Sequence, residues 1–286
     1  MSEIIRGFVY RLNPSNEQMN LIDQTFGCVR KMWNTLLFER KSIYELIGKY
    51  PELLNSHDYM NPKYIKEYFP YMYDVDSQAL TTAWLNLKNA YTNFFNKRHK
   101  EPRYKSRHND IQSYTTHTIG KNIRFEGSYL KLPKLGLVKI RCHRPLPKGS
   151  LIKAATIKKE AGKYYVSLRI KYEHEIKEEK AFQKAIGLDY ALHGLYVDSE
   201  GHRADYPDYY KQSLNKLKTE QRILSRRVKG SNRYETQKQR LSKLHQHVRN
   251  QRKDFLHKAS RHLVNTYDVI SIETLDLTEM AKTKHF

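Results

Sequence analysis

Two carboxylates stand directly after short apolar runs that favour β-strands, and this placement suits metal chemistry. Asp189 follows Ile186 and Leu188 in AIGLDY, and Glu273 follows the β-branched run VISI. An unpaired charge is costly to bury, so an acid at a strand end needs either a solvated turn or a charged partner. If the two strands are parallel neighbours, the acids meet at one edge of a sheet, where hard oxygen ligands hold Mg²⁺ and assist attack on a phosphodiester. The alternative is that the two acids are unrelated strand ends.

The most basic part of the chain lies between these acids. Residues 211–261 contain sixteen Lys or Arg residues and three acids. A charged helix face is usually just solvated, but this surplus exceeds what solubility needs and is typical of a groove that follows nucleic-acid phosphates. In RRVKGSNR, Gly230 interrupts the helical pattern between cations, which suits a turn against a nucleic-acid backbone. The candidate phosphate contacts are Arg222, Arg226, Arg227, Lys229, Arg233, Arg252 and Lys253.

The composition as a whole is strongly cationic. In 286 residues, 52 Lys and Arg against 30 Asp and Glu give a net charge of +22. Such a field attracts polyanions, of which nucleic acid is the commonest and a membrane surface is the competitor. The sequence shows no apolar run of about 18 residues and no signal peptide, so we expect a cytoplasmic protein with no membrane partner. Two cysteines, Cys28 and Cys142, exclude a disulfide framework and a four-thiolate zinc site.

The N-terminal part predicts one strand followed by a helical unit. Residues 4–12 read as a strand that ends at Asn13-Pro14, and Ser15 with Gln18 is a capping-box signature. Apolar residues then recur every three or four positions on one helical face, at Met19, Ile22, Phe26, Val29, Trp33 and Leu36. A second helix within 74–100 has its own stripe, at Leu80, Trp84, Leu87, Ala90, Tyr91 and Phe94.

The remaining sequence predicts a β-rich part and then an α/β part. After Arg107 short β-rich runs alternate with Gly, Pro and Asn, and KEAGKYYVSLRI predicts a hairpin with Ala161-Gly162 at its tip. These strands favour a small antiparallel barrel, which the first strand is able to join, so that the helical unit is an insertion. The charged linker EHEIKEEKAFQK leads to two strands around 185–198, two long polar helices and a continuous apolar run, YDVISIETLDL, that predicts a buried strand.

These features together resemble the TnpB (OrfB) proteins that bacterial insertion sequences encode, which are compact RNA-guided nucleases related to type V CRISPR effectors. The IGLDYALHGLYVDSEG segment is similar to the family's first RuvC-like motif, and NQRKDFLHKASRHLVNTYDVISIETLDLTEM to the second. Other matching segments are GCVRKMWN, FPYMYDVDSQAL and PRYKSRHNDIQSYTT, so the resemblance covers nearly the whole chain in the family's order.

The resemblance implies an α+β multidomain fold, a guide RNA, and double-stranded target DNA with a short flanking motif, bound in a bacterial cytoplasm at the nucleoid. By position it makes Asp189 and Glu273 the first two metal-binding acids. The implied domains are a first wedge strand (1–10), a helical recognition domain (11–107), a wedge β-barrel (108–180) and a partial RuvC-like domain of the RNase H fold (181–286).

The resemblance also implies nucleic-acid contacts near the flanking motif. Gln78 and Gln112 are candidates for reading base edges, because glutamine pairs bidentately with adenine. The neighbouring candidates by family position are Arg103, Lys105, Arg107, Tyr114 and Thr115. For each, an ordinary helix or strand surface is the alternative.

The chain departs from the family pattern after the second motif. The family continues with a zinc ribbon and a third acid. This sequence contains neither before its last residues, AKTKHF. In addition, Glu273 is followed by Thr274, where the family usually has Asp. Two of three acids would hold Mg²⁺ weakly, and an ångström of misplacement can cost about 100-fold in rate. We therefore expect no zinc site, a weak or vestigial Mg²⁺ site, and a nuclease-dead repressor that acts by occupying its target.

Two other functions remain open. One is an active Mg²⁺-dependent RuvC-like endonuclease associated with transposition, with this sequence as a truncated chain. The other is a DNA-binding protein that works without RNA, which fits the charge but explains the acid pair poorly.

Overall fold

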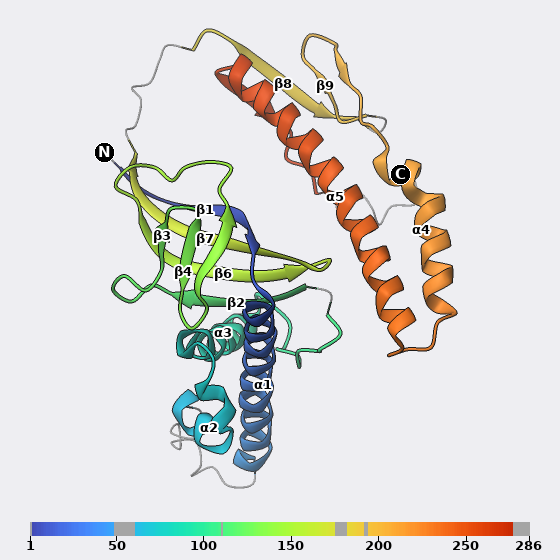
Figure 1. Ribbon diagram of the computed structural model, residues 1–286. Coiled ribbons are helices and arrows are strands. Elements are labelled where there is room, and N and C mark those ends of the chain that lie inside the picture. The colour runs from blue at the N-terminus through green and yellow to red at the C-terminus, as the bar shows by residue number, and fades with distance from the viewer. Residues whose placement is uncertain (1, 49–60, 110, 175–181, 192–193, 277–286) are drawn as a thin grey trace. The chain divides into compact units, whose positions relative to one another are not determined.

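The computed structural model describes residues 2–48, 61–109, 111–174, 182–191 and 194–276. The chain divides into two compact units, Met1–Ile176 and Lys177–Phe286, each with its own sheet (Figure 1). The predicted charged linker, 173–184, spans this division, and its residues 175–181 lie outside the described part.

The first unit is built on a seven-stranded antiparallel sheet with the order β2-β6-β7-β1-β5-β4-β3. Its strands are β1 (Ser2–Asn13), β2 (Ile111–His117), β3 (Arg124–Glu126), β4 (Tyr129–Leu132), β5 (Gly136–Arg141), β6 (Leu151–Glu160) and β7 (Lys163–His174). β1 pairs with β5 and with β7. The prediction that the first strand joins the later ones, with the helices inserted between them, is therefore confirmed.

The sheet is curled but open. In the described residues β2 and β3 are its two edges, so the barrel expected from the sequence is a half-barrel. β3 and β4 contain three and four residues, which gives them little length for further pairing. One core cluster joins residues of the helices to residues of the sheet, so helices cover part of the sheet where a closed barrel would have facing strands.

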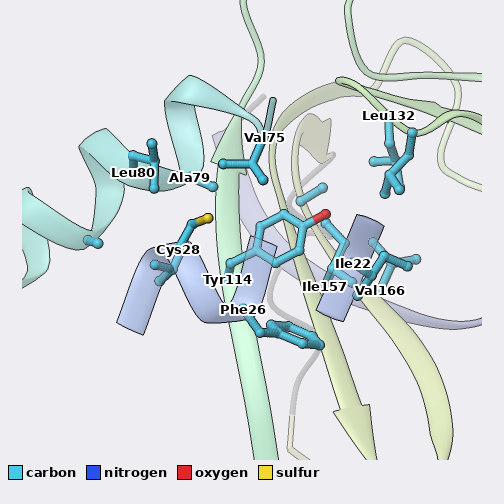
Figure 2. Packing of buried hydrophobic residues seen from close by; sticks show 14 of the residues in the cluster. Ile22, Phe26, Cys28, Val75, Ala79, Leu80, Tyr114, Leu132, Ile157 and Val166 are labelled. Atoms are coloured by element: carbon cyan, nitrogen blue, oxygen red, sulfur yellow. The ribbon is translucent and has the colours of Figure 1, made fainter. Parts of the chain in front are cut away.

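In the described residues between β1 and β2 lie the helical segments α1 (Asn16–Ile47), α2 (Pro62–Tyr68), the 3-10 turn η3 (Pro70–Tyr73) and α3 (Ser77–Phe95). The predicted capping box is confirmed, because the Gln18 amide donates to Ser15 Oγ at 3.3 Å and the Ser15 amide donates to Gln18 Oε1 at 3.0 Å. The apolar stripes of α1 and α3 form the helical side of the core with β2, β6 and β7 (Figure 2).

The predicted hairpin at the end of the β-rich part is also confirmed. Glu160 pairs with Lys163, so that Ala161 and Gly162 are the two-residue tip between β6 and β7. Both tip residues have positive φ, +48° and +75°, as in the turns whose twist matches the flanking strands.

The second unit has a four-stranded sheet with the order β10-β9-β8-β11. Its elements are β8 (Ala185–Tyr190), β9 (Tyr196–Asp198), β10 (Arg203–Ala204), α4 (Tyr209–Ser225), α5 (Asn232–Thr266) and β11 (Val269–Ile272). Leu217, Leu224 and Leu241 form a small core between α4 and α5. Gly230, with φ of +83°, lies in the turn between these helices, as its place in RRVKGSNR predicts.

The strand predicted to be buried is exposed. β11 has four residues, and Ile272 is 71% exposed. Within the described residues β11 is an edge strand that pairs only with β8, so its apolar side chains lack the second neighbour that a central strand has.

None of the helices in the described part of the chain has both the length and the apolar character of a membrane span.

Candidate metal centre and nucleic-acid interface

The sheet of the second unit brings Asp189 and Glu273 to neighbouring positions. β8 and β11 are parallel, with Leu188 opposite Ile272. Asp189 is the next residue along β8, and Glu273 immediately follows β11. Adjacent strands lie about 4.8 Å apart, so two carboxylates emerge from neighbouring strand ends. The predicted adjacency is confirmed, and the role of the acids as metal ligands stays a prediction.

Both acids are exposed and line an open hollow of about 550 Å³. The hollow has a fixed wall, because the Gly187 amide donates to Ser199 Oγ at 3.2 Å and the Ser199 amide donates to the Gly187 carbonyl at 2.9 Å. These bonds tie β8 to the turn after β9. Because both acids are exposed, a solvated ion or a phosphate group has access to the two carboxylates.

A third acid, Asp198 at the end of β9, lines the same hollow and was missed from the sequence. Its Oδ1 accepts hydrogen bonds from the amides of Glu200 at 3.0 Å and His202 at 2.8 Å. Asp198 pairs directly with Leu188, so its side chain lies on the face of the sheet opposite to Asp189. In the sequence, Asp198 precedes Ser-Glu-Gly, which is a turn signal, and in the structure Asp198 holds this turn through the two hydrogen bonds.

The described residues fit Mg²⁺ only in part. Asp189 and Glu273 offer the hard oxygen ligands that Mg²⁺ prefers. Within the described ranges, however, no group of three or more His, Cys, Asp or Glu side chains is arranged to hold a metal ion. A two-metal mechanism needs a fuller set of ligands than these two carboxylates, so we derive no catalytic step through a metal.

In the first unit, Lys105 and Gln112 line a hollow of about 210 Å³ beside α1. The segment that contains Lys105 is fastened to α1 by two side chains. Trp33 Nε1 donates to the Arg103 carbonyl at 3.0 Å, and the Asn34 amide exchanges two bonds with the Lys105 backbone, at 3.0 and 2.8 Å.

The ammonium of Lys105 lies 3.9 Å from the centre of the Trp33 ring. The residue as a whole is exposed, but loss of water around the amine lowers the pKa of Lys105. Arg30, half-buried on α1, lines the same hollow and has no hydrogen-bond or ion-pair partner among the described residues. Arg30 was also missed, although GCVRKMWN contains it, and with Lys105 it makes the hollow cationic.

The other candidates of the first unit have different surroundings. Gln112 Nε2 donates to the Arg107 carbonyl at 3.2 Å, which leaves its Oε1 for another donor. Thr115 is half-buried, and its hydroxyl lies 2.8 Å from that of Thr156 on β6. Gln78 is half-buried in the first turn of α3 and does not line this hollow.

Tyr114 requires a correction. Its side chain is 4% exposed, and its ring lies edge to face with Phe26 at 5.6 Å (Figure 2). Alternate residues of β2 point to opposite faces, and Tyr114 faces the core. The ring packs the interior of the first unit instead of presenting a face to a base.

The two arginine candidates of this region, Arg103 and Arg107, are both exposed.

The seven cations predicted as phosphate contacts in the second unit fall into two groups, and all seven are exposed. Five lie around the turn between α4 and α5: Arg222, Arg226, Arg227, Lys229 and Arg233. Arg252 and Lys253 lie about 30 Å farther along α5, at 1.5 Å per residue. Arg252 Nε donates to the Tyr206 hydroxyl at 2.9 Å. The seven residues therefore do not form one patch.

Comparisons with known proteins show to which family the chain belongs. A family model described as "Probable transposase", of the OrfB type, matches residues 167–284, and one described as "Helix-turn-helix domain" matches residues 1–49. A "Putative RNA-guided DNA endonuclease" of Streptomyces pristinaespiralis is 31% identical over 286 residues, which is 99% of this chain and 70% of that protein. The chain belongs to the TnpB/OrfB family.

Another relative of this TnpB/OrfB chain is the "Putative RNA-guided DNA endonuclease InsQ" of Escherichia coli, 29% identical over 98% of the chain and 68% of InsQ. A Cas12f1 chain, solved in a complex with sgRNA and target DNA, matches with a TM-score of 0.51 and 10% identity over 96% of this chain and 81% of that chain. At this identity the match shows a shared fold. The family model described as "Helix-turn-helix domain" matches residues 1–49. In the TnpB/OrfB chain, the described part of that range is one strand followed by one continuous helix.

Proposed function

We propose that this TnpB/OrfB chain binds double-stranded DNA under the direction of a guide RNA, beside a short flanking motif. The observation that carries the proposal is the similarity to the two endonuclease relatives over nearly the whole chain. In such a protein, base pairing reads most of the target, and the protein contacts the backbone and the shape of the RNA–DNA hybrid.

The charge distribution supports this proposal. A net charge of +22 favours a polyanionic partner, and the cations at the α4–α5 turn are free of acidic neighbours in sequence from Arg222 to Arg233. In the first unit, Arg30 and Lys105 would contact phosphates, and Gln112 and Gln78 would read bases of the flanking motif.

We further propose that the chain occupies its target without effective cleavage, and thereby represses transcription. Two features support this step. The described hollow offers only Asp189 and Glu273 as uncommitted carboxylates, since Asp198 holds the β9–β10 turn. Poorly positioned ions cost catalysis far more than they cost binding, because binding rests on the cationic surfaces.

The test uses the full chain purified with its copurifying RNA. Sequencing of that RNA is expected to give one structured species with a short variable end. A DNA duplex that matches this end is then added with Mg²⁺, with Asp189→Asn as the matched variant. We expect stable occupancy of the matched duplex by both proteins and no cleavage product. Cutting by the wild type that Asp189→Asn abolishes would disprove occupancy without cleavage.

A Mg²⁺-dependent, RNA-guided endonuclease is the second candidate function. The parallel register that puts Asp189 next to Glu273 favours it, since paired carboxylates are what such an enzyme requires. A DNA-binding protein independent of RNA is the third candidate. Ribonuclease treatment before the duplex is added separates the third from the others, because only RNA-independent binding survives it.

A further inference from the structure

A second hollow of the first unit, of about 410 Å³, opens between α1 and α3. It is lined by Arg40 from α1 and by residues on one face of α3, among them Trp84, Lys88, Tyr91 and Phe95. Their spacing of three or four residues puts these four side chains in one stripe. The hollow is separate from the one beside Lys105, and the resemblance to TnpB proteins assigned none of its residues.

The guanidinium of Arg40 lies over aromatic rings in this hollow. Its Cζ lies 4.0 Å from the centre of the Tyr91 ring and 6.0 Å from that of Phe95. Among the described residues the half-buried Arg40 makes no hydrogen bond and no ion pair. Stacking on a ring satisfies the face of a guanidinium but leaves the N–H groups on its edge, which are suited to a phosphate.

The aromatic rings of the hollow are partly open to solvent. Tyr91 is buried, but Phe95 is 51% exposed and lies 6.1 Å from Tyr91 with an interplanar angle of 28°. Trp84 is half-buried, and the ammonium of Lys88 lies 6.0 Å from its ring. Exposed aromatic faces beside cations are the features by which proteins stack bases and hold the adjacent phosphate.

We infer that this hollow binds an unpaired nucleotide of RNA, with the base against Phe95 or Trp84 and the phosphate at Arg40 and Lys88. The inference rests on the proposed function for the presence of RNA. Two cations at the hollow favour an anionic ligand over an apolar peptide. An RNA segment is favoured over target DNA because RNA accompanies the chain before any target is bound, whereas DNA offers unpaired bases only in the strand that the guide displaces.

Ultraviolet crosslinking of the full chain with its copurified RNA, followed by mass spectrometry, tests the contact directly. We expect a ribonucleotide adduct on the peptide that contains Trp84, Tyr91 and Phe95. Adducts elsewhere in the chain with none on this peptide would overturn the inference. A deoxyribonucleotide adduct here, formed only when target DNA is added, would overturn the assignment to RNA.

Variants give a quantitative test. Phe95→Ala and Arg40→Gln together are expected to weaken RNA binding about tenfold, the loss typical of one base–aromatic stack. Phe38→Ala is the matched control, since Phe38 is 62% exposed on α1 and does not line the hollow. Circular dichroism checks that the helices are intact in each variant. If the wild type holds no RNA, the proposed function fails. If the wild type and the double variant hold RNA equally, only the present inference fails.

Discussion

Asp189 and Glu273 lie at strand ends, where a carboxylate keeps its water while the strand before it supplies a rigid base. Ile186, three residues before Asp189 on the same strand, is 2% exposed and anchors β8. The exposed side chain of Glu273 needs no such burial, because β11 is held to β8 by its backbone. The acidic pair therefore depends more on the pairing register of the strands than on burial of the acids. The turns that keep β8 and β9 in register are for that reason important for the acidic pair.

Gly194 is the residue on which that register most visibly depends. Its φ is +113°, and a Cβ atom added there would lie 2.7 Å from the Ala204 carbonyl oxygen, closer than real Cβ contacts. That oxygen already accepts from the Leu195 amide at 2.8 Å. We predict that Gly194→Ala destabilises the sheet of the second unit by about 3 kcal/mol, the sum of a clash and a strained φ. Amide hydrogen exchange in β8 and β9 measures the effect.

The control for this change is Gly201→Ala. Gly201 also has a positive φ, +83°, but a Cβ atom there would meet nothing within 4 Å. We expect a loss of about 1 kcal/mol from φ alone. Equal losses for the two variants would show that the approach of the Ala204 carbonyl is unimportant.

Among the elements, α1 has two functions. Its inner face fills the core of the first unit, with Ile22 and Leu36 fully buried. Trp33 and Asn34 meanwhile hold the segment that leads into β2. One helix thus positions both the core and the cationic hollow around Lys105.

We predict that Asn34→Ala releases the backbone of Lys105. The two lost hydrogen bonds are partly exposed, so the free energy of unfolding should fall by only about 1 kcal/mol. Exchange of the Lys105 amide proton should accelerate much more than that of β2. Asn20→Ala, an exposed position on the same helix, is the control and should change neither quantity. Unchanged protection of Lys105 in Asn34→Ala would contradict this anchoring.

The α4–α5 turn is the element whose cations should matter most for nucleic-acid affinity. We predict that Arg226→Gln with Arg227→Gln lowers the slope of log K against log salt concentration by about two, one for each lost phosphate contact. Lys258→Gln is the control, because Lys258 is paired with Asp254 at 2.7 Å. Binding titrations between low and moderate salt measure the slopes. Equal slopes for all three proteins would remove this turn from the interface.

At the scale of the whole chain, buried protonated groups give stability a defined pH dependence. Burial raises the pKa values of Tyr10, Tyr91, Tyr114 and Cys28 above their ordinary values. These groups ionise first in the unfolded chain, so the folded state holds more protons in alkaline solution. Their contribution is complete below about pH 8 and is lost as the pH rises through about 9 to 10 and beyond.

We therefore predict that the first unit begins to lose stability above about pH 9 and loses it steeply above about pH 10, where each such group contributes up to about 1.4 kcal/mol per pH unit. Urea unfolding at several pH values measures this slope. Tyr114→Phe should make the slope shallower, because Tyr114 is among the most buried of the tyrosines. Tyr129→Phe, at a position 42% exposed, should leave the slope unchanged. A slope that is the same in all three proteins would show that burial of Tyr114 does not control it.

Local signals in the sequence were sufficient where the physics is local. The Ser15–Gln18 cap, the stripes of α1 and α3 and the tip at Ala161-Gly162 depend on residues within a few positions of one another. Burial is different, because it depends on which elements become neighbours. Family position made Tyr114 a candidate for the nucleic-acid interface, but its side chain lies in the core against Phe26. The apolar run at β11 likewise predicts a buried strand, but among the described residues β11 lies at the edge of its sheet.

The sequence by itself determined the family of this protein, its cationic character and the two strand-end acids, because these are properties of residue order and composition. Only the tertiary structure decided that Arg30 joins Lys105 and that Arg40 faces Phe95 across two helices. The physical reason is distance along the chain. Such contacts join residues that are tens of positions apart, and they arise only when packing of the core fixes the elements that carry them.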